Sequence, residues 1–208
     1  AIGLEHELTP TLVLDYITKL VSSLDEQTYN LKLLLLGDST VDDTKLYILP
    51  LNPSFPDRKL YKNGATAITV EYERYLPNAK TLNMLPSYLA YRTAKKHGAY
   101  DALLVNSHGE LLEGTRTNVF AMKGSTLYTP PAAVVLEGVT RTNIMQCAQD
   151  NKFTLKESSL PLADVEHFDS FFLSSTSTKI MPLKAINQTN FTISDELKRL
   201  MKAFSRFD

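Results

Sequence analysis

Short apolar segments separated by turn-forming residues dominate the middle of the chain. Four segments rich in Leu, Val and Phe predict short strands at residues 102–106, 110–113, 119–123 and 126–128. Glycine-containing segments between them predict the turns. Residues 142–151 then predict a helix, so this region should form a compact sheet followed by a helix.

The first 75 residues show a different order, in which a helix precedes the strands. Thr9 followed by Pro10 is a helix-start signature, and apolar residues recur after it at helical spacing as far as Leu24. Strands are predicted at residues 30–36, 45–49 and 65–73, the last from an alternation of period two. We therefore expect a small α/β domain over residues 1–75.

The remaining segments predict further helices and strands. A helix should end at Lys95-Lys96-His97-Gly98, where basic residues precede a glycine stop. Residues 153–159 and 169–173 predict strands, residues 174–179 a hydroxyl-rich loop, and a final helix should begin near Ser194. We expect residues 76–80 to join the small domain to a larger domain over residues 81–208, and the fold class to be α/β (α+β).

Composition and charge exclude several classes of protein. The 208 residues carry 22 basic and 23 acidic side chains, a net charge of −1, which gives no electrostatic footprint for nucleic acid or an anionic membrane. The longest apolar runs are far shorter than the roughly 18–20 residues of a membrane span, and no secretory signal is visible. Four dispersed histidines argue against a metal site. A single cysteine, Cys147, expected to be buried in a helix, favours a cytoplasmic protein.

Two features of the central region could carry chemistry. Glu113 ends a predicted strand, and the segment from Gly138 to Arg141 leads into the predicted helix, whose start would offer backbone N–H groups and a hydroxyl to an anion. Each also has an ordinary explanation, since most such glutamates are solvated turn residues and most such helix starts are plain caps.

The motifs around these residues resemble a known family. Residues 113–120, EGTRTNVF, are similar to the E-x-x-x-[ST]-N-x-F signature of the class IV (fold type IV) aminotransferases, and residues 136–141, LEGVTR, resemble their L-x-G-[IV]-T-R. The resemblance covers roughly residues 60 to 190. It implies a two-domain enzyme with a barrel-like sheet flanked by helices in the larger domain. It also implies the cofactor pyridoxal 5'-phosphate and a homodimer.

One lysine gains a role only through this resemblance. Lys80 alone would be an ordinary surface residue, but the family's catalytic lysine lies on the inter-domain segment at about this distance before the acid. Residues 80–85, KTLNML, resemble the K-x-L-N-x-L of D-amino-acid aminotransferases and aminodeoxychorismate lyases. Branched-chain members usually carry tyrosine where this chain has Leu85.

The resemblance implies a set of site residues. Lys80 would form a Schiff base with the cofactor and then act as general base, and Glu113 would bind the pyridine nitrogen. Thr117 and Asn118 would fix the turn that orients Glu113, and Arg74 could supply charge near the phosphate. The phosphate itself would be bound by Val139, Thr140, Ser175 and Thr176.

Three interpretations of function stay open. The leading one is transfer of an amino group between a small amino acid and a 2-oxo acid. The second is aminodeoxychorismate lyase activity with the same lysine and carboxylate, and the third is a catalytically idle relative. Family members begin with several dozen residues, including a phosphate-binding arginine, that have no counterpart here, so we expect either a truncated enzyme or a shortened relative.

Overall fold

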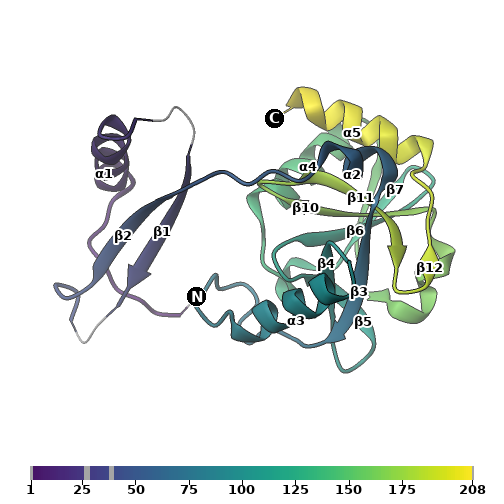
Figure 1. The fold of residues 1–208 in the computed structure, drawn as a ribbon, viewed down its shortest axis with the longest axis horizontal. Helices are drawn as coiled ribbons and strands as arrows, with labels where there is room; N and C mark the ends of the chain where they lie inside the picture. Colours follow the sequence, from purple (N-terminus) through teal and green to yellow (C-terminus); the bar gives the residue numbers. More distant parts are fainter. Residues whose placement is uncertain (1, 26–28, 38–39, 208) are drawn as a thin grey trace. The chain divides into compact units, whose positions relative to one another are not determined.

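The computed structural model describes residues 2–25, 29–37 and 40–207, and these form two compact units, Ala1–Phe55 and Pro56–Asp208. Figure 1 shows the elements of each unit along the chain. The division falls earlier than the expected boundary at residue 75. The reason is that the strand beginning at Ala65 pairs with strands of the second unit.

The first unit contains one helix and a two-stranded sheet. Helix α1 (Pro10–Ser22) begins as predicted, with Thr9 as its N-cap accepting a hydrogen bond from the Leu12 amide at 3.2 Å. Strand β1 (Asn30–Leu36) pairs antiparallel with β2 (Lys45–Leu51). A helix and two strands can bury only a small core, and α1 has no fully buried residue.

The second unit is built on a ten-stranded sheet that closes on itself. The closed ring runs β6-β10-β11-β3-β4-β5 and returns to β6, while β7 and β8 extend it from β6, β9 from β5 and β12 from β11. The strands are β3 (Ala65–Glu71), β4 (Asp101–Val105), β5 (Glu110–Gly114), β6 (Asn118–Lys123), β7 (Thr126–Thr129), β8 (Thr154–Glu157), β9 (Leu160–Pro161), β10 (Ser170–Ser175), β11 (Lys179–Ile186) and β12 (Thr189–Asn190). This confirms the barrel-like sheet expected for the larger domain.

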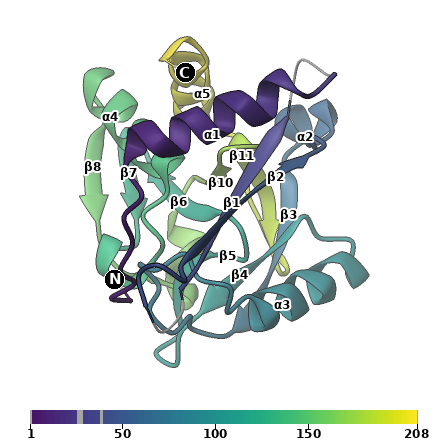
Figure 2. The ribbon, with the colours of Figure 1, turned by 90° about the vertical axis from the view of Figure 1, so that its left-hand side faces the viewer.

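Helices cover the outside of this ring. Helix α3 (Leu85–Lys96) packs on β3 and β4, whereas α4 (Val139–Asp150) packs on β8 and β10 and contacts α5 (Asp195–Phe207) (Figure 2). A short helix, α2 (Arg58–Asn63), precedes β3, and two 3-10 helices span Ala132–Val134 and Leu162–His167. The flanking helices expected from the sequence are confirmed.

The core of the second unit has one layer inside the ring and two outside it. Val119, Phe171 and Leu173 alternate with Phe120 and Phe172, so that the first three face the interior and the last two face α4 and α5. The Phe120 and Phe172 rings stack with centroids 4.8 Å apart. Cys147 is fully buried in this α4 layer, as predicted.

The hydroxyl-rich residues 174–179 predict a polar loop, and the sequence pattern predicts no element for residues 180–186. The structure has a long, largely buried strand there, β11, between β10 and β3. Pro182, which lacks an N–H group, is unusual in a central strand. It is accommodated beside a register shift between Leu183 and Ala185 in the pairing with β3.

Candidate active site

Glu113 is a deeply buried carboxylate at the end of β5, 3% exposed. Arg74 donates to its Oε1 from Nε at 2.8 Å and also from Nη2, and the Leu136 amide donates to Oε2 at 3.2 Å. Burial raises the pKa of Glu113, and the adjacent Arg74 guanidinium opposes that rise. A carboxylate accepts about four hydrogen bonds, so one further donor can still bind at Oε2.

Asn118 lies beside Glu113 and fixes the segment that enters α4. The two residues are cross-strand partners between β5 and β6. The Asn118 side chain donates to the Leu136 carbonyl at 2.8 Å. Its Oδ1 would lie 2.6 Å from a Cβ added to Gly138, so only glycine fits at that position without movement. Glu113 and Asn118 therefore bind the two backbone groups of Leu136.

The start of α4 is open to an anion. Its N-cap is Gly138, which has no side chain to accept from the first-turn amides, and no side-chain cap is formed. Those amides have no partners within the helix and carry the positive end of the helix dipole. Val139 is 76% exposed, whereas Thr140 is buried. Among the described residues, the two predicted phosphate ligands of α4 thus lie at an uncapped helix start.

The hydroxyl-rich turn lies at the same end of the sheet. Register pairs Glu113 with Asn118, Asn118 with Ser174, and Ser174 with Ile180, so these side chains share the face that α4 covers. Ser174 is fully buried, and its Oγ has no hydrogen-bond partner in the described part of the chain. The turn after it carries further hydroxyls at this end of the sheet.

The two predicted ligands of this turn differ in exposure. Ser175 Oγ is 2.9 Å from Thr178 Oγ1, so it already has a partner, and Thr176 is exposed. Ser174, which the sequence analysis did not name, faces the α4 side instead. Because side chains alternate along a strand, Ser174 and Ser175 point to opposite faces.

Thr117 contacts a carboxylate that the sequence analysis missed. Its hydroxyl donates to Oδ2 of Asp101 at 2.9 Å, and Asp101 is 1% exposed at the start of β4. The Thr115 hydroxyl and amide both donate to Oδ1, which also accepts from the Ala102 amide at 2.8 Å. Asp101 precedes the candidate motif by a dozen residues, so only strand pairing brings them together.

Lys80 lies on the irregular segment between β3 and α3 and is exposed. Within the described ranges it forms no ion pair or side-chain hydrogen bond, in contrast to Arg74 on the same segment. The structure therefore gathers Arg74, Glu113, Asn118 and the start of α4, and it leaves the lysine amine available to solvent.

Arg141 anchors the first turn of α4 from the buried side of the helix. Its side chain is 1% exposed, and its Nη2 donates to the Pro130 carbonyl at 3.0 Å and to Glu157 Oε2 at 2.8 Å. The hydrogen bond from Arg141 lowers the pKa of Glu157, and the Ala132 amide adds to this effect. The arginine of the L-x-G-[IV]-T-R motif thus positions the helix start and does not face it.

These groups fit an anion joined to a protonated ring nitrogen. Uncapped helix amides suit a phosphate, because they neither titrate nor need a counter-cation. The remaining acceptor position on Glu113 suits an N–H⁺ donor, and a charge-assisted bond of that kind contributes about 1.5–3 kcal/mol. These donors and acceptors therefore fit pyridoxal phosphate.

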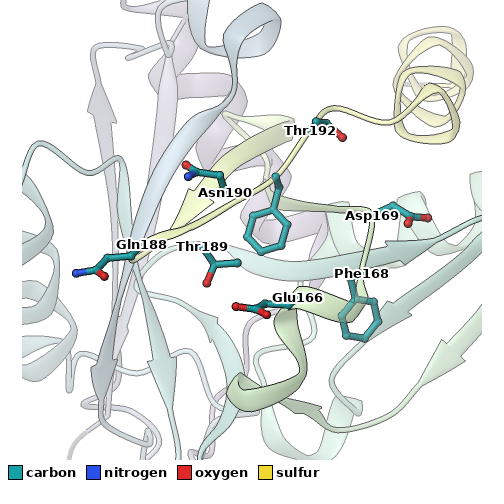
Figure 3. A pocket seen from close by; sticks show the side chains of 8 residues that line it. Glu166, Phe168, Asp169, Gln188, Thr189, Asn190 and Thr192 are labelled. Atoms are coloured by element: carbon teal, nitrogen blue, oxygen red, sulfur yellow. The ribbon is translucent and has the colours of Figure 1, made fainter.

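A separate surface hollow lies at the opposite end of the sheet. It has a volume of about 630 Å³ and is lined by Glu166, Asp169, Asn190 and neighbouring residues (Figure 3). None of the predicted site residues lines it. Among the described residues there is no group of three or more potential metal-ligating side chains, and no helix is long and apolar enough to cross a membrane.

A closed mixed barrel with a buried glutamate beside an uncapped helix start defines the larger domain of a fold type IV enzyme. The sequence pattern of the amino-transferase class IV family matches residues 1–186, and the chain belongs to this family. The D-alanine aminotransferase of Bacillus licheniformis is 30% identical over 139 residues, which are 64% of this chain and 49% of that protein. The chain thus spans about half the length of that relative.

Solved structures show the same fold. A putative 4-amino-4-deoxychorismate lyase from Legionella pneumophila superposes with a TM-score of 0.88 at 21% identity, covering 100% of this chain and 80% of that one. An aminotransferase from Brucella abortus bound to the co-factor PLP gives a TM-score of 0.81 at 21% identity, covering 99% of this chain and 78% of that one. These likenesses confirm the expected fold.

Proposed function

We propose that this chain holds the cofactor-binding part of a pyridoxal-phosphate-dependent aminotransferase, which transfers an amino group between a small amino acid and a 2-oxo acid. The observation that carries the proposal is the buried Glu113 carboxylate, with one acceptor position left, which binds the Leu136 amide two residues before the uncapped start of α4 at Gly138. Family membership and the PLP-bound relative support it.

Bound here, pyridoxal phosphate would supply an electron sink for the electron pair left when an α-proton is removed. Glu113 would hold a proton on the ring nitrogen through Oε2, with Arg74 favouring the charged carboxylate that this task requires. The first-turn amides of α4, Thr140 and the turn that contains Thr176 would bind the phosphate. Thr117 and Asn118 would orient Glu113 and the α4 segment.

Lys80 would supply the reactive amine. Its Nζ would hold the cofactor through a covalent bond and, when free, would act as the general base that accepts the α-proton of the substrate. The Lys80 side chain is exposed on an irregular segment, so its amine is accessible to a cofactor and to a substrate.

The proposal is tested by trapping the cofactor. The chain is mixed with pyridoxal phosphate, excess is removed, and the absorbance spectrum is recorded before and after borohydride reduction, with peptide mapping of the modified lysine. Lys80→Ala is compared with Lys96→Ala, a matched exposed lysine at the end of α3. We expect a visible band and a modification on Lys80 that only Lys80→Ala loses. Modification spread over several lysines, or no retained cofactor, would overturn the proposal.

A second assay separates transfer from elimination. A panel of amino acids with a 2-oxo acid acceptor should give the exchanged products. Formation of p-aminobenzoate from aminodeoxychorismate without any acceptor would instead establish the lyase reaction. The lyase is the alternative because the putative lyase from Legionella pneumophila has the same fold. Retained cofactor with no turnover in either assay would establish the idle relative.

We also propose that two copies of the chain associate, in the cytoplasm. Helix α3 exposes Leu85, Tyr88 and Leu89, which recur at helical spacing on one side. An apolar stripe of this kind is typical of an interface. Light scattering after size exclusion should give a dimer mass, and Tyr88→Glu should shift it to the monomer. A monomer for the unmodified chain would refute the assignment.

A further inference from the structure

We propose that Asp101 is a positioning residue that sets the direction of the Glu113 carboxylate through the turn that follows it. This inference rests on the proposed role of Glu113 and concerns a residue outside the motifs at residues 113–120 and 136–141. Its basis is a group of hydrogen bonds that joins the start of β4 to residues 114–117.

Asp101 is a buried hydrogen-bond acceptor. Its side chain is 1% exposed and accepts from the Ala102 amide, the Thr115 amide and hydroxyl, and the Thr117 hydroxyl. Every one of these partners is a donor that a carboxylate can satisfy, and none of them is a cation. A buried polar group is tolerated only when hydrogen bonds replace those it made with water, which this arrangement provides.

Backbone hydrogen bonds also hold the turn at residues 114–117. The Gly114 amide donates to the Thr117 carbonyl at 2.7 Å, which closes the turn, and the Thr115 amide also donates to the Ala102 carbonyl at 3.1 Å. A Cβ on Gly114 would lie 2.1 Å from Thr117 Oγ1 and 2.6 Å from Asp101 Oδ2. The two side chains thus lie directly against the glycine that follows Glu113.

The turn at residues 114–117 lies directly between two residues of the candidate site. Glu113 is the residue before Gly114, and Asn118 is the residue after Thr117, and these two are cross-strand partners. Fixing residues 114–117 therefore fixes both residues that bind Leu136. Loss of the Asp101 carboxylate would release the turn, while the Arg74 and Leu136 bonds of Glu113 would remain as its anchors.

The control is Asp169, an exposed carboxylate that binds a turn at the other end of the same sheet. Its Oδ2 accepts from the Gly124 amide at 2.6 Å, next to the hollow of Figure 3. Asp169→Asn removes a charge from a turn-binding aspartate just as Asp101→Asn does, but away from Glu113. It should loosen the Gly124 turn alone.

The first experiment uses the chain without cofactor. Amide hydrogen exchange is measured by NMR at Gly114, Thr115 and Gly124 in the unmodified chain and in the two Asn variants. We expect exchange at Gly114 and Thr115 to accelerate at least about tenfold in Asp101→Asn and to stay within about twofold in Asp169→Asn. Unchanged exchange at Gly114 and Thr115 in Asp101→Asn would overturn the proposal.

The second experiment is a double-mutant cycle with Glu113→Gln, using affinity for pyridoxal phosphate and kcat as readouts. If Asp101 acts through Glu113, Asp101→Asn reduces kcat at least about tenfold when Glu113 is intact, and less than about twofold when it is added to the Glu113→Gln variant. Equal reductions in both backgrounds would refute the positioning role. Full activity of Glu113→Gln alone would instead refute the proposed function of Glu113.

A variant that fails to fold is avoided by a smaller change. Thr115→Val keeps the shape of the side chain and removes one hydroxyl donor to Asp101. It should give the same pattern in both experiments with a smaller amplitude. A Thr115→Val variant that matches the unmodified chain in amide exchange, while Asp101→Asn is unfolded, would assign Asp101 to stability alone and overturn the proposal.

Discussion

The ion pair between the buried Arg141 of α4 and the exposed Glu157 allows a prediction that runs against simple counting of contacts. Arg141 is 1% exposed, whereas the Glu157 side chain is 40% exposed. Glu157→Ala would therefore leave a buried guanidinium with the Pro130 carbonyl as its remaining acceptor. Removing one partner of a buried pair costs about 3–5 kcal/mol, and we take the lower end, about 3 kcal/mol, because water can reach the position of Glu157.

The second variant removes the charge as well. In Arg141→Met/Glu157→Ala an apolar side chain of similar length fills the space, and no ion has to be buried. We expect the double variant to be more stable than Glu157→Ala by at least about 1 kcal/mol, although it has lost one more hydrogen-bonding group. Urea unfolding followed by circular dichroism measures both free energies, and about 3 kcal/mol corresponds to roughly 6–12 °C in Tm at this chain length.

An exposed ion pair provides the control, and the pH dependence of stability provides a second check. Glu196→Ala breaks an exposed pair with Arg199 and should cost less than about 1 kcal/mol. The pKa of Glu157 is lowered in the folded chain, so its contribution is present above the unfolded value and is lost as the pH falls through the folded one. The difference between the unmodified chain and Glu157→Ala should shrink at acid pH. A double variant no more stable than Glu157→Ala would refute the reasoning.

Three further predictions concern the candidate site. Gly114→Ala should lower the free energy of unfolding by about 2–4 kcal/mol, because its Cβ would overlap Thr117 Oγ1 and displace a donor from Asp101. A loss under about 0.5 kcal/mol in urea unfolding would contradict this. Ser174→Ala should leave the free energy of unfolding unchanged or raise it by up to about 1 kcal/mol, since Ser174 Oγ has no hydrogen-bond partner among the described residues. A clear loss of stability in urea unfolding would contradict this. Burial raises the pKa of Glu113 above its ordinary 4.5, so the folded chain binds more protons than the unfolded chain in this pH range. The stability that Glu113 contributes therefore falls as pH rises from 4.5 through the folded pKa. Glu113→Gln should remove this pH dependence of the unfolding free energy, and an unchanged pH dependence in the variant would contradict the prediction.

Much of this fold could be predicted from the sequence because its strands are short and their turns are well marked. The strands between residues 101 and 129 lie within a residue or two of the expected bounds, since glycine and polar residues interrupt each apolar run. Strand β11 was not predicted, because Pro182 and the preceding hydroxyl residues argue against a central strand. The division at Phe55 was also not visible, since β3 looks the same whichever unit it joins.

The site could be predicted only as far as local motifs reach. Glu113, Asn118 and the start of α4 belong to two motifs in the right order, and the structure brings them into contact through Leu136. Asp101 and Arg141 have no local signal for what they do, because their partners arrive through strand pairing and through a loop more than ten residues away. A buried carboxylate a dozen residues before one motif and a buried guanidinium inside the other are stabilised by neighbours that sequence spacing does not specify. The groups that orient such a site therefore have to be found by asking where each buried charge obtains its hydrogen bonds.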